Sequence, residues 1–102
     1  DFISVHDVVN ANISVMNSSA ADYESFNVGT GKKVTIKEAA EKIAKVYGSK
    51  IQPKITFSYR KGDVRHCYPD ISKITSKTEW RPKVSFDEAL KEIVDWTKIH
   101  RK

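Results

Sequence analysis

A short basic stretch, residues 59–70, carries the side chains best suited to ligand chemistry in this sequence. Arg60 and Arg65 have planar guanidinium groups, which hold phosphate oxygens through paired hydrogen bonds. Gly62 allows a turn with positive φ and a close approach of backbone to a ligand. Asp63 offers a carboxylate, either to a sugar hydroxyl or as a counter-charge for Arg65. We therefore expect this stretch to hold the diphosphate and ribose of a nucleotide. The alternative is a basic surface turn without a ligand.

The size and charge of the chain set limits on its function. Its 102 residues make one domain or a piece of one, and a net charge of +5 favours anionic partners such as nucleic acid, nucleotides or phosphosugars. Hydrophobic residues at 39% and charged residues at 30% are ordinary for a soluble globular protein. There is no membrane-spanning apolar run. The single cysteine excludes an internal disulfide and fits a reducing cytoplasm, where we place the protein.

Metal and nucleophile chemistry find little support in the residue pattern. His6, His66 and His100 are scattered along the chain, so we expect no metal site. Cys67 has only the adjacent His66 as a candidate base, and neighbouring side chains point in opposite directions in an extended chain. We predict no catalytic residue in this chain.

Aromatic residues near the basic stretch leave a rival function open. Phe57, Tyr59 and Tyr68 flank it and could stack on the bases of single-stranded nucleic acid. Together with the positive charge, they allow a stand-alone nucleic-acid-binding module. Aromatic residues that alternate along a strand are more often part of a core.

The positioning elements include helices with clear start signals. Thr35–Glu38 and Ser85–Glu88 are capping boxes, in which a hydroxyl and a glutamate satisfy backbone groups at a helix start. Gly48 suits the end of the first of these helices. An earlier helix, with Asp7 as its N-cap, is predicted from the helical spacing of three apolar residues, which are Val9, Ile13 and Met16. It should end near residues 17–19.

A short third helix is predicted after Pro69, with Asp70 as its N-cap and Trp80 packing it onto the rest of the chain. Residues 2–5, 23–28, 54–59 and 64–68 read as short strands or extended segments. Gly29-Thr30-Gly31 reads as a tight turn between a strand and a helix, because Val34 replaces the third glycine of a dinucleotide-binding loop. Lys32-Lys33 also lacks the context of a phosphate-binding P-loop. The predicted fold is a small α+β domain with about four helices and a few short strands.

Four passages, in this order, resemble the C-terminal substrate-binding part of extended short-chain dehydrogenases/reductases in the nucleotide-sugar epimerase and dehydratase group. The chain is most similar to the UDP-glucose 4-epimerases. The passages are DFISVHDVV at residues 1–9, FNVGTG at 26–31, RKGDVR at 60–65 and WRPKVSF at 80–86. Thr78 and Glu79 stand where the family usually has Leu-Gly before the tryptophan, so the preceding helix is expected to pack differently.

The resemblance implies five substrate-binding residues. Arg60 corresponds to the arginine that binds the nucleotide diphosphate, and Asp63 to the carboxylate that meets the ribose hydroxyls. Phe2 and Ile36 match positions near the nucleotide, and Arg65 matches a further phosphate or structural contact. The family's second phosphate-binding arginine would immediately precede Asp1.

The resemblance also implies a missing half. In this family a bound NAD takes and returns a hydride while a Tyr-x-x-x-Lys pair moves protons; neither that pair nor the glycine-rich NAD loop is in this sequence. We therefore expect residues 1–102 to be the C-terminal nucleotide-sugar-binding domain of a longer NAD-dependent nucleotide-sugar epimerase, inactive and without cofactor when isolated. A 4,6-dehydratase or decarboxylase is the alternative parent. We expect a UDP-sugar or similar ligand, a homodimeric parent, a self-associating isolated domain, and no nucleic-acid or membrane partner.

Overall fold

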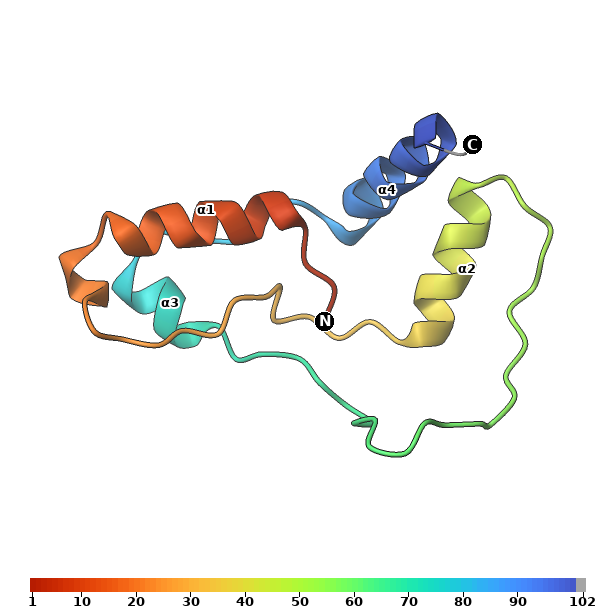
Figure 1. The fold of residues 1–102 in the computed structure, drawn as a ribbon, viewed down its shortest axis with the longest axis horizontal. Helices are drawn as coiled ribbons and strands as arrows, with labels where there is room; N and C mark the ends of the chain where they lie inside the picture. Colours follow the sequence, from red (N-terminus) through yellow and green to blue (C-terminus); the bar gives the residue numbers. More distant parts are fainter. Residues whose placement is uncertain (101–102) are drawn as a thin grey trace.

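The computed structural model describes residues 1–100, which form helices joined by long extended segments (Figure 1). The helices are α1 (Val5–Met16), the 3₁₀ turn η1 (Ser19–Ala21), α2 (Ile36–Val46), α3 (Ser72–Lys77) and α4 (Phe86–His100). Figure 1 shows α1 and α3 together at one end, with α2 and α4 together at the other. The segment between α2 and α3, drawn in green, runs along the outside. None of the helices within residues 1–100 is long and apolar enough to cross a membrane.

The core lies where α1, α3 and the segment after α3 meet. Ala11, Ile74 and Trp80 are buried against one another, and the Trp80 indole Nε1–H donates a hydrogen bond of 3.0 Å to the Asp7 carbonyl. The indole is thus both packed and hydrogen-bonded, as a buried tryptophan requires. The prediction that Trp80 packs the third helix onto the rest of the chain is confirmed.

Asp7 is not the N-cap of α1, as the sequence had suggested. Ser4 takes that position, and its hydroxyl accepts from the His6 N–H at 3.2 Å. Asp7 is 1% exposed, and its carboxylate accepts from the backbone N–H groups of Lys83 and Val84 at 2.9–3.1 Å. The N-cap prediction was wrong because these two donors, on the segment that leads into α4, need a buried acceptor.

The three apolar residues that predicted α1 are at the surface. Val9 and Ile13 are about half exposed and Met16 is 83% exposed, while the buried members of α1 are Asp7 and Ala11. The helix itself is confirmed, and so is its end, with Asn17 as the C-cap. The apolar spacing predicted the helix correctly, but not which face of it is buried in residues 1–100.

Both predicted capping boxes are present. The Glu38 N–H donates to the Thr35 hydroxyl at 3.1 Å, and the Thr35 N–H donates to the Glu38 carboxylate at 2.8 Å. Ser85 and Glu88 repeat the arrangement at 3.2 and 2.8 Å. The Thr35 N–H and hydroxyl both donate to the Glu38 carboxylate, and the Ser85 hydroxyl and N–H both donate to the Glu88 carboxylate; because these bonds favour the ionised form, they lower the pKa values of both glutamates. Gly48, with φ of +68°, follows the end of α2 as predicted.

The start of α3 differs from the prediction by one residue. Ile71 occupies the N-cap position without a side-chain cap, so the assignment of Asp70 as N-cap was wrong. Asp70 still serves the first turn, because its carboxylate accepts from the Ser72 N–H at 2.8 Å. This bond lowers the pKa of Asp70.

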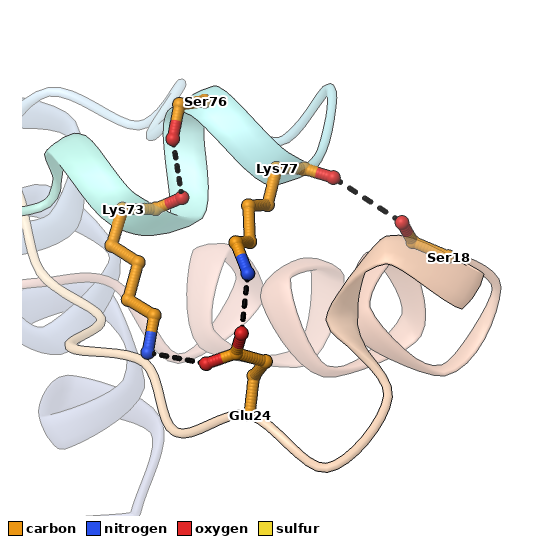
Figure 2. A network of polar contacts seen from close by, with 5 residues as sticks. All are labelled: Ser18, Glu24, Lys73, Ser76 and Lys77. Atoms are coloured by element: carbon orange, nitrogen blue, oxygen red, sulfur yellow. Dashed lines mark hydrogen bonds and ion pairs between the residues drawn. The ribbon is translucent and has the colours of Figure 1, made fainter.

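A polar network ties the extended segment before the glycine turn to α3 (Figure 2). Glu24 accepts from the Lys73 ammonium at 2.7 Å and also pairs with the Lys77 ammonium. The hydrogen bonds from Lys73 and then Lys77 are the main reason that the pKa of Glu24 falls to about 2. On the other side, the Ser18 hydroxyl donates to the Lys77 carbonyl at 3.2 Å.

No β-strand is present in the described part of the chain, which is a small four-helix unit. Residues 23–28, 54–59 and 64–68 follow irregular or extended paths without ladder partners, and α1 begins within the predicted strand at residues 2–5. An alternating pattern favours an extended backbone, but a strand exists only where another strand hydrogen-bonds to it. The expectation of a few strands is therefore not met within residues 1–100.

Candidate functional site

A groove of about 890 Å³ lies between three segments that are far apart in the sequence. Its walls are residues 1–2, residues 33–36 at the start of α2, and residues 64–68. The Asp1 backbone nitrogen donates to the Cys67 carbonyl at 2.9 Å and so joins the first wall to the third. The volume falls in the range of pockets that hold small molecules.

The Asp1 carboxylate fixes the glycine turn next to the groove. It accepts from the N–H groups of Thr30 and Gly31, each at 2.9 Å, and from the Thr30 hydroxyl at 3.0 Å. A Cβ on Gly29 would lie 2.3 Å from Pro69 Cγ and 2.9 Å from an Asp1 carboxylate oxygen. The turn therefore needs glycine at position 29 because other parts of the chain pack against it, in agreement with its interpretation as a tight turn.

The apolar part of the groove comes from Phe2 and Ile36. The Phe2 ring is 40% exposed and packs at 5.3 Å between ring centroids against Phe86, the first residue of α4. Ile36, the first residue of α2, is 75% exposed. The Lys42 ammonium lies over the Phe86 ring and pairs with Asp87 at 2.7 Å, which holds α2 and α4 together behind this wall.

The charged part of the groove is cationic. Arg65 is exposed and makes no ion pair or side-chain hydrogen bond with any of residues 1–100. The Lys33 ammonium lies 4.9 Å from the centroid of the Tyr68 ring, also without an ion pair in this part of the chain. Because the Asp1 carboxylate is already engaged, the charges left to face a ligand are positive. Such a groove suits an anion that also carries a flat or apolar group.

Arg60 and Asp63 lie on the neighbouring basic turn and not among the residues that line the groove. The Arg60 Nε–H donates to the Asp63 carboxylate at 3.0 Å, and the Asp63 N–H donates to the Arg60 carbonyl at 3.1 Å. Gly62 has φ of +93°, which supports the turn predicted there. The Arg60 side chain is 89% exposed. The structure thus brings together three of the five predicted substrate-binding residues, Phe2, Ile36 and Arg65, and leaves Arg60 and Asp63 paired with each other beside them.

Sequence reasoning did not identify Asp1, Lys33 or Tyr68 as parts of this site. In the sequence, Lys33 lacks the context of a P-loop, and Tyr68 is only an aromatic flank of the basic stretch. The contact between them joins two distant segments, so no local pattern could indicate it. The unpaired N–H groups of the glycine turn were a usable signal for Asp1, because such donors require an acceptor.

Comparisons with known proteins agree on one family. The family model described as GDP-mannose 4,6 dehydratase matches residues 1–93. The dTDP-L-rhamnose 4-epimerase of Burkholderia thailandensis is 30% identical over 96 residues, which are 94% of this chain and 26% of that protein.

Two crystal structures resemble the fold closely. The UDP-glucose 4-epimerase of Thermotoga maritima, solved with UDP-glucose, matches with a TM-score of 0.90 and 35% identity over 100% of this chain and 32% of that one. The UDP-glucose 4-epimerase of Bifidobacterium longum, in complex with NAD⁺ and UDP, matches with a TM-score of 0.84 and 26% identity. That match covers 98% of this chain and 30% of the epimerase chain. The chain spans only about a quarter to a third of the length of these relatives.

Proposed function

Because the chain belongs to the GDP-mannose 4,6-dehydratase family of extended short-chain dehydrogenases/reductases, we propose that it is the nucleotide-sugar-binding part of an NAD-dependent nucleotide-sugar 4-epimerase. The observation that carries the proposal is the groove. It gathers Phe2, Ile36 and Arg65 in a chain that matches, over its whole length, an epimerase solved with UDP-glucose. A nucleotide sugar offers the flat base and the anionic diphosphate that such a groove suits.

The proposed roles follow from the chemistry of each side chain. Phe2 and Ile36 would flank the nucleoside, since both present apolar surface to the groove. Arg65 would bind a phosphate from the groove wall, and Arg60 would bind the diphosphate from the adjacent turn. Asp63 would accept hydrogen bonds from the ribose hydroxyls. For this the exposed ion pair between Arg60 and Asp63 must open, and such surface pairs stabilise a protein by at most about 1 kcal/mol.

The residues of this chain do not fit NAD itself. The only G-x-G turn in the sequence, Gly29–Gly31, already donates its N–H groups at positions 30 and 31 to the Asp1 carboxylate. The sequence also has no Tyr-x-x-x-Lys pair. We infer that the NAD site and the proton-transfer residues belong to a further part of the parent enzyme, and that this part alone does not catalyse epimerisation.

The predicted α+β fold, with a few short strands, is consistent with the same proposal for the parent enzyme. The extended segments at residues 23–28 and 54–59 pair with no other strand within residues 1–100, and α1 exposes an apolar face that includes Val9, Ile13 and Met16. We propose that the NAD-binding part supplies strand partners and covers this face. Without that cover, the isolated chain should self-associate.

A binding experiment tests the proposal. UDP-glucose is titrated into ¹⁵N-labelled protein, with a short oligonucleotide as comparator and Arg60→Ala, Asp63→Ala and Lys61→Ala as variants. We expect shifts in the backbone signals of the groove and of residues 60–65, weaker binding in the first two variants, and little change in the Lys61 control. Tight oligonucleotide binding with no response to UDP-glucose would show that this surface serves nucleic acid instead.

A further inference from the structure

Lys33 connects two walls of the groove. It comes from the wall formed by residues 33–36, and its ammonium lies over the ring of Tyr68 on the wall formed by residues 64–68, 4.9 Å from the centroid. The preceding residue, Lys32, is also exposed but does not line the groove. The chain therefore presents two adjacent lysines, of which only one lies at the candidate site.

Most cations that make a contact in the described residues pair with a carboxylate, and Lys33 does not; Lys98, over the Tyr47 ring, shares this arrangement but does not line the groove. Lys42 pairs with Asp87, Lys73 and Lys77 pair with Glu24, and Arg60 pairs with Asp63. Lys33 has an aromatic ring as its partner in place of a carboxylate, within the part of the chain that the structure describes. An aromatic face attracts a cation through its quadrupole without cancelling the charge. Tyr68 thus holds the ammonium at the groove while its charge stays available to an anion.

We propose that Lys33 is a diphosphate-binding residue of this site and that Tyr68 positions it. The inference rests on the proposed function, since it assumes that a nucleoside diphosphate occupies the groove. Lys33 and Arg65 come from different walls, so together they can bind a diphosphate from two sides. An ammonium acts as a compact point charge, which suits contact with either phosphate. The charge state of the ligand, and not its base or sugar, would then decide how much Lys33 contributes.

Isothermal titration of the protein with UDP, UMP and uridine tests this assignment. The variants are Lys33→Met, which keeps the length and removes the charge, Lys33→Arg, which keeps the charge, and Lys32→Met as the matched control. We expect Lys33→Met to weaken UDP binding about tenfold, because a charged hydrogen bond is lost. Uridine binding should change less than about twofold, and UMP should fall in between. Lys33→Arg should restore most of the UDP affinity, and Lys32→Met should behave as the unaltered protein does.

A double-variant cycle tests the role of Tyr68. Tyr68→Leu should weaken UDP binding when Lys33 is present, and should add little when Lys33 is already methionine, because the ring acts through the ammonium. Equal effects in both backgrounds would overturn the positioning role.

The outcomes separate this inference from the proposed function. If the unaltered protein binds UDP and Lys33→Met matches Lys32→Met, Lys33 is not a diphosphate contact, although the groove is still a nucleotide site. If Lys33→Met weakens uridine as much as UDP, the residue has only a structural role, and near-UV circular dichroism will show the altered packing. If the unaltered protein binds neither UDP nor uridine, the proposed function and this inference both fail.

Discussion

Replacement of Asp7 by asparagine should destabilise the protein and also weaken its ligand site. Asp7 is buried, and its carboxylate accepts from the backbone N–H groups of Lys83 and Val84 at 2.9–3.1 Å. These residues lead directly into the Ser85 cap of α4, and Phe86 follows at the first turn of that helix. One carboxylate on α1 therefore fixes where α4 begins.

The expected magnitude follows from the buried donor that asparagine adds without an acceptor. Asparagine has the same shape as aspartate, but only one of its two terminal atoms accepts and the other is an NH₂ donor. The Oδ2 atom accepts from both backbone N–H groups and Oδ1 from Lys83 alone, so an amide oxygen at the Oδ2 position keeps both donors but leaves the buried NH₂ group against the Lys83 N–H, without an acceptor. An unsatisfied buried polar group costs about 1–3 kcal/mol, and loss of the charge weakens the bonds that remain. We expect a total loss of about 2–3 kcal/mol, a large part of the stability of a small domain.

Urea unfolding followed by tryptophan fluorescence measures this loss, because Trp80 lies in the core and hydrogen-bonds to Asp7. Asp95→Asn is the matched control, since Asp95 is an exposed aspartate of α4 and should change stability by less than about 0.5 kcal/mol. UDP binding should weaken as well, because a displaced Phe86 no longer supports Phe2 in the groove wall. Equal stability of the two variants would refute the argument that Asp7 anchors α4.

Three further predictions concern the core, the glycine turn and the Glu24 network. Ile74→Ala should cost about 2–5 kcal/mol in urea unfolding because it empties a fully buried position, whereas Ile99→Ala on the exposed face of α4 should be nearly neutral. Gly29→Ala should cost about 1–3 kcal/mol, since its Cβ would lie 2.3 Å from Pro69 Cγ; if the added Pro69→Ala change gives no recovery in melting temperature, steric conflict is not the cause. Glu24 has its pKa lowered from 4.5 to about 2 by Lys73 and Lys77, so its contribution to stability should be complete above about pH 4.5 and should disappear as the pH falls towards 2. Glu24→Gln should therefore lower the urea midpoint at neutral pH but not near pH 2, and an equal loss at both would contradict the ionic origin.

The sequence predicted correctly those features that depend only on residues close together in the chain. The two capping boxes and the glycine at the end of α2 depend on neighbouring residues only, and all three were located correctly. Asp7 was misread for the complementary reason: its short side chain suits an N-cap, but its partners lie at residues 83 and 84. The strand predictions failed in the same way, because alternation describes one segment whereas a ladder needs two.

The candidate site was predictable mainly through resemblance. Phe2, Ile36 and Arg65 come from three distant segments, and no spacing in the sequence places them in one groove. The ordered family motifs identified these residues as substrate-binding, and so placed them at one site indirectly. Lys33 was missed because its sequence context lacks the residues of a P-loop, and because its contact with Tyr68 exists only in the folded chain.

The groove and the basic turn differ in how firmly the fold holds them, and this difference bears on binding. The groove is fixed on one side by the Asp1 carboxylate and on another by the packing of Phe2 on Phe86. Within residues 1–100, the Arg60–Asp63 turn has only its own hydrogen bonds, and its glycine has no atom within 4 Å of an added Cβ.

A diphosphate seated at Arg65 could therefore draw the turn towards the groove. Opening the exposed ion pair costs at most about 1 kcal/mol, while an arginine–phosphate bond returns about 1.5–3 kcal/mol. Because the arginine–phosphate bond stabilises more than opening the ion pair destabilises, ligand binding and closure of the turn should be coupled. Arg60→Ala should then speed the dissociation of UDP more than it slows association, whereas loss of a charge that steers the ligand would chiefly slow association. Stopped-flow measurement of both rates distinguishes the two, and a change confined to the association rate would mean that Arg60 attracts the nucleotide without closing over it.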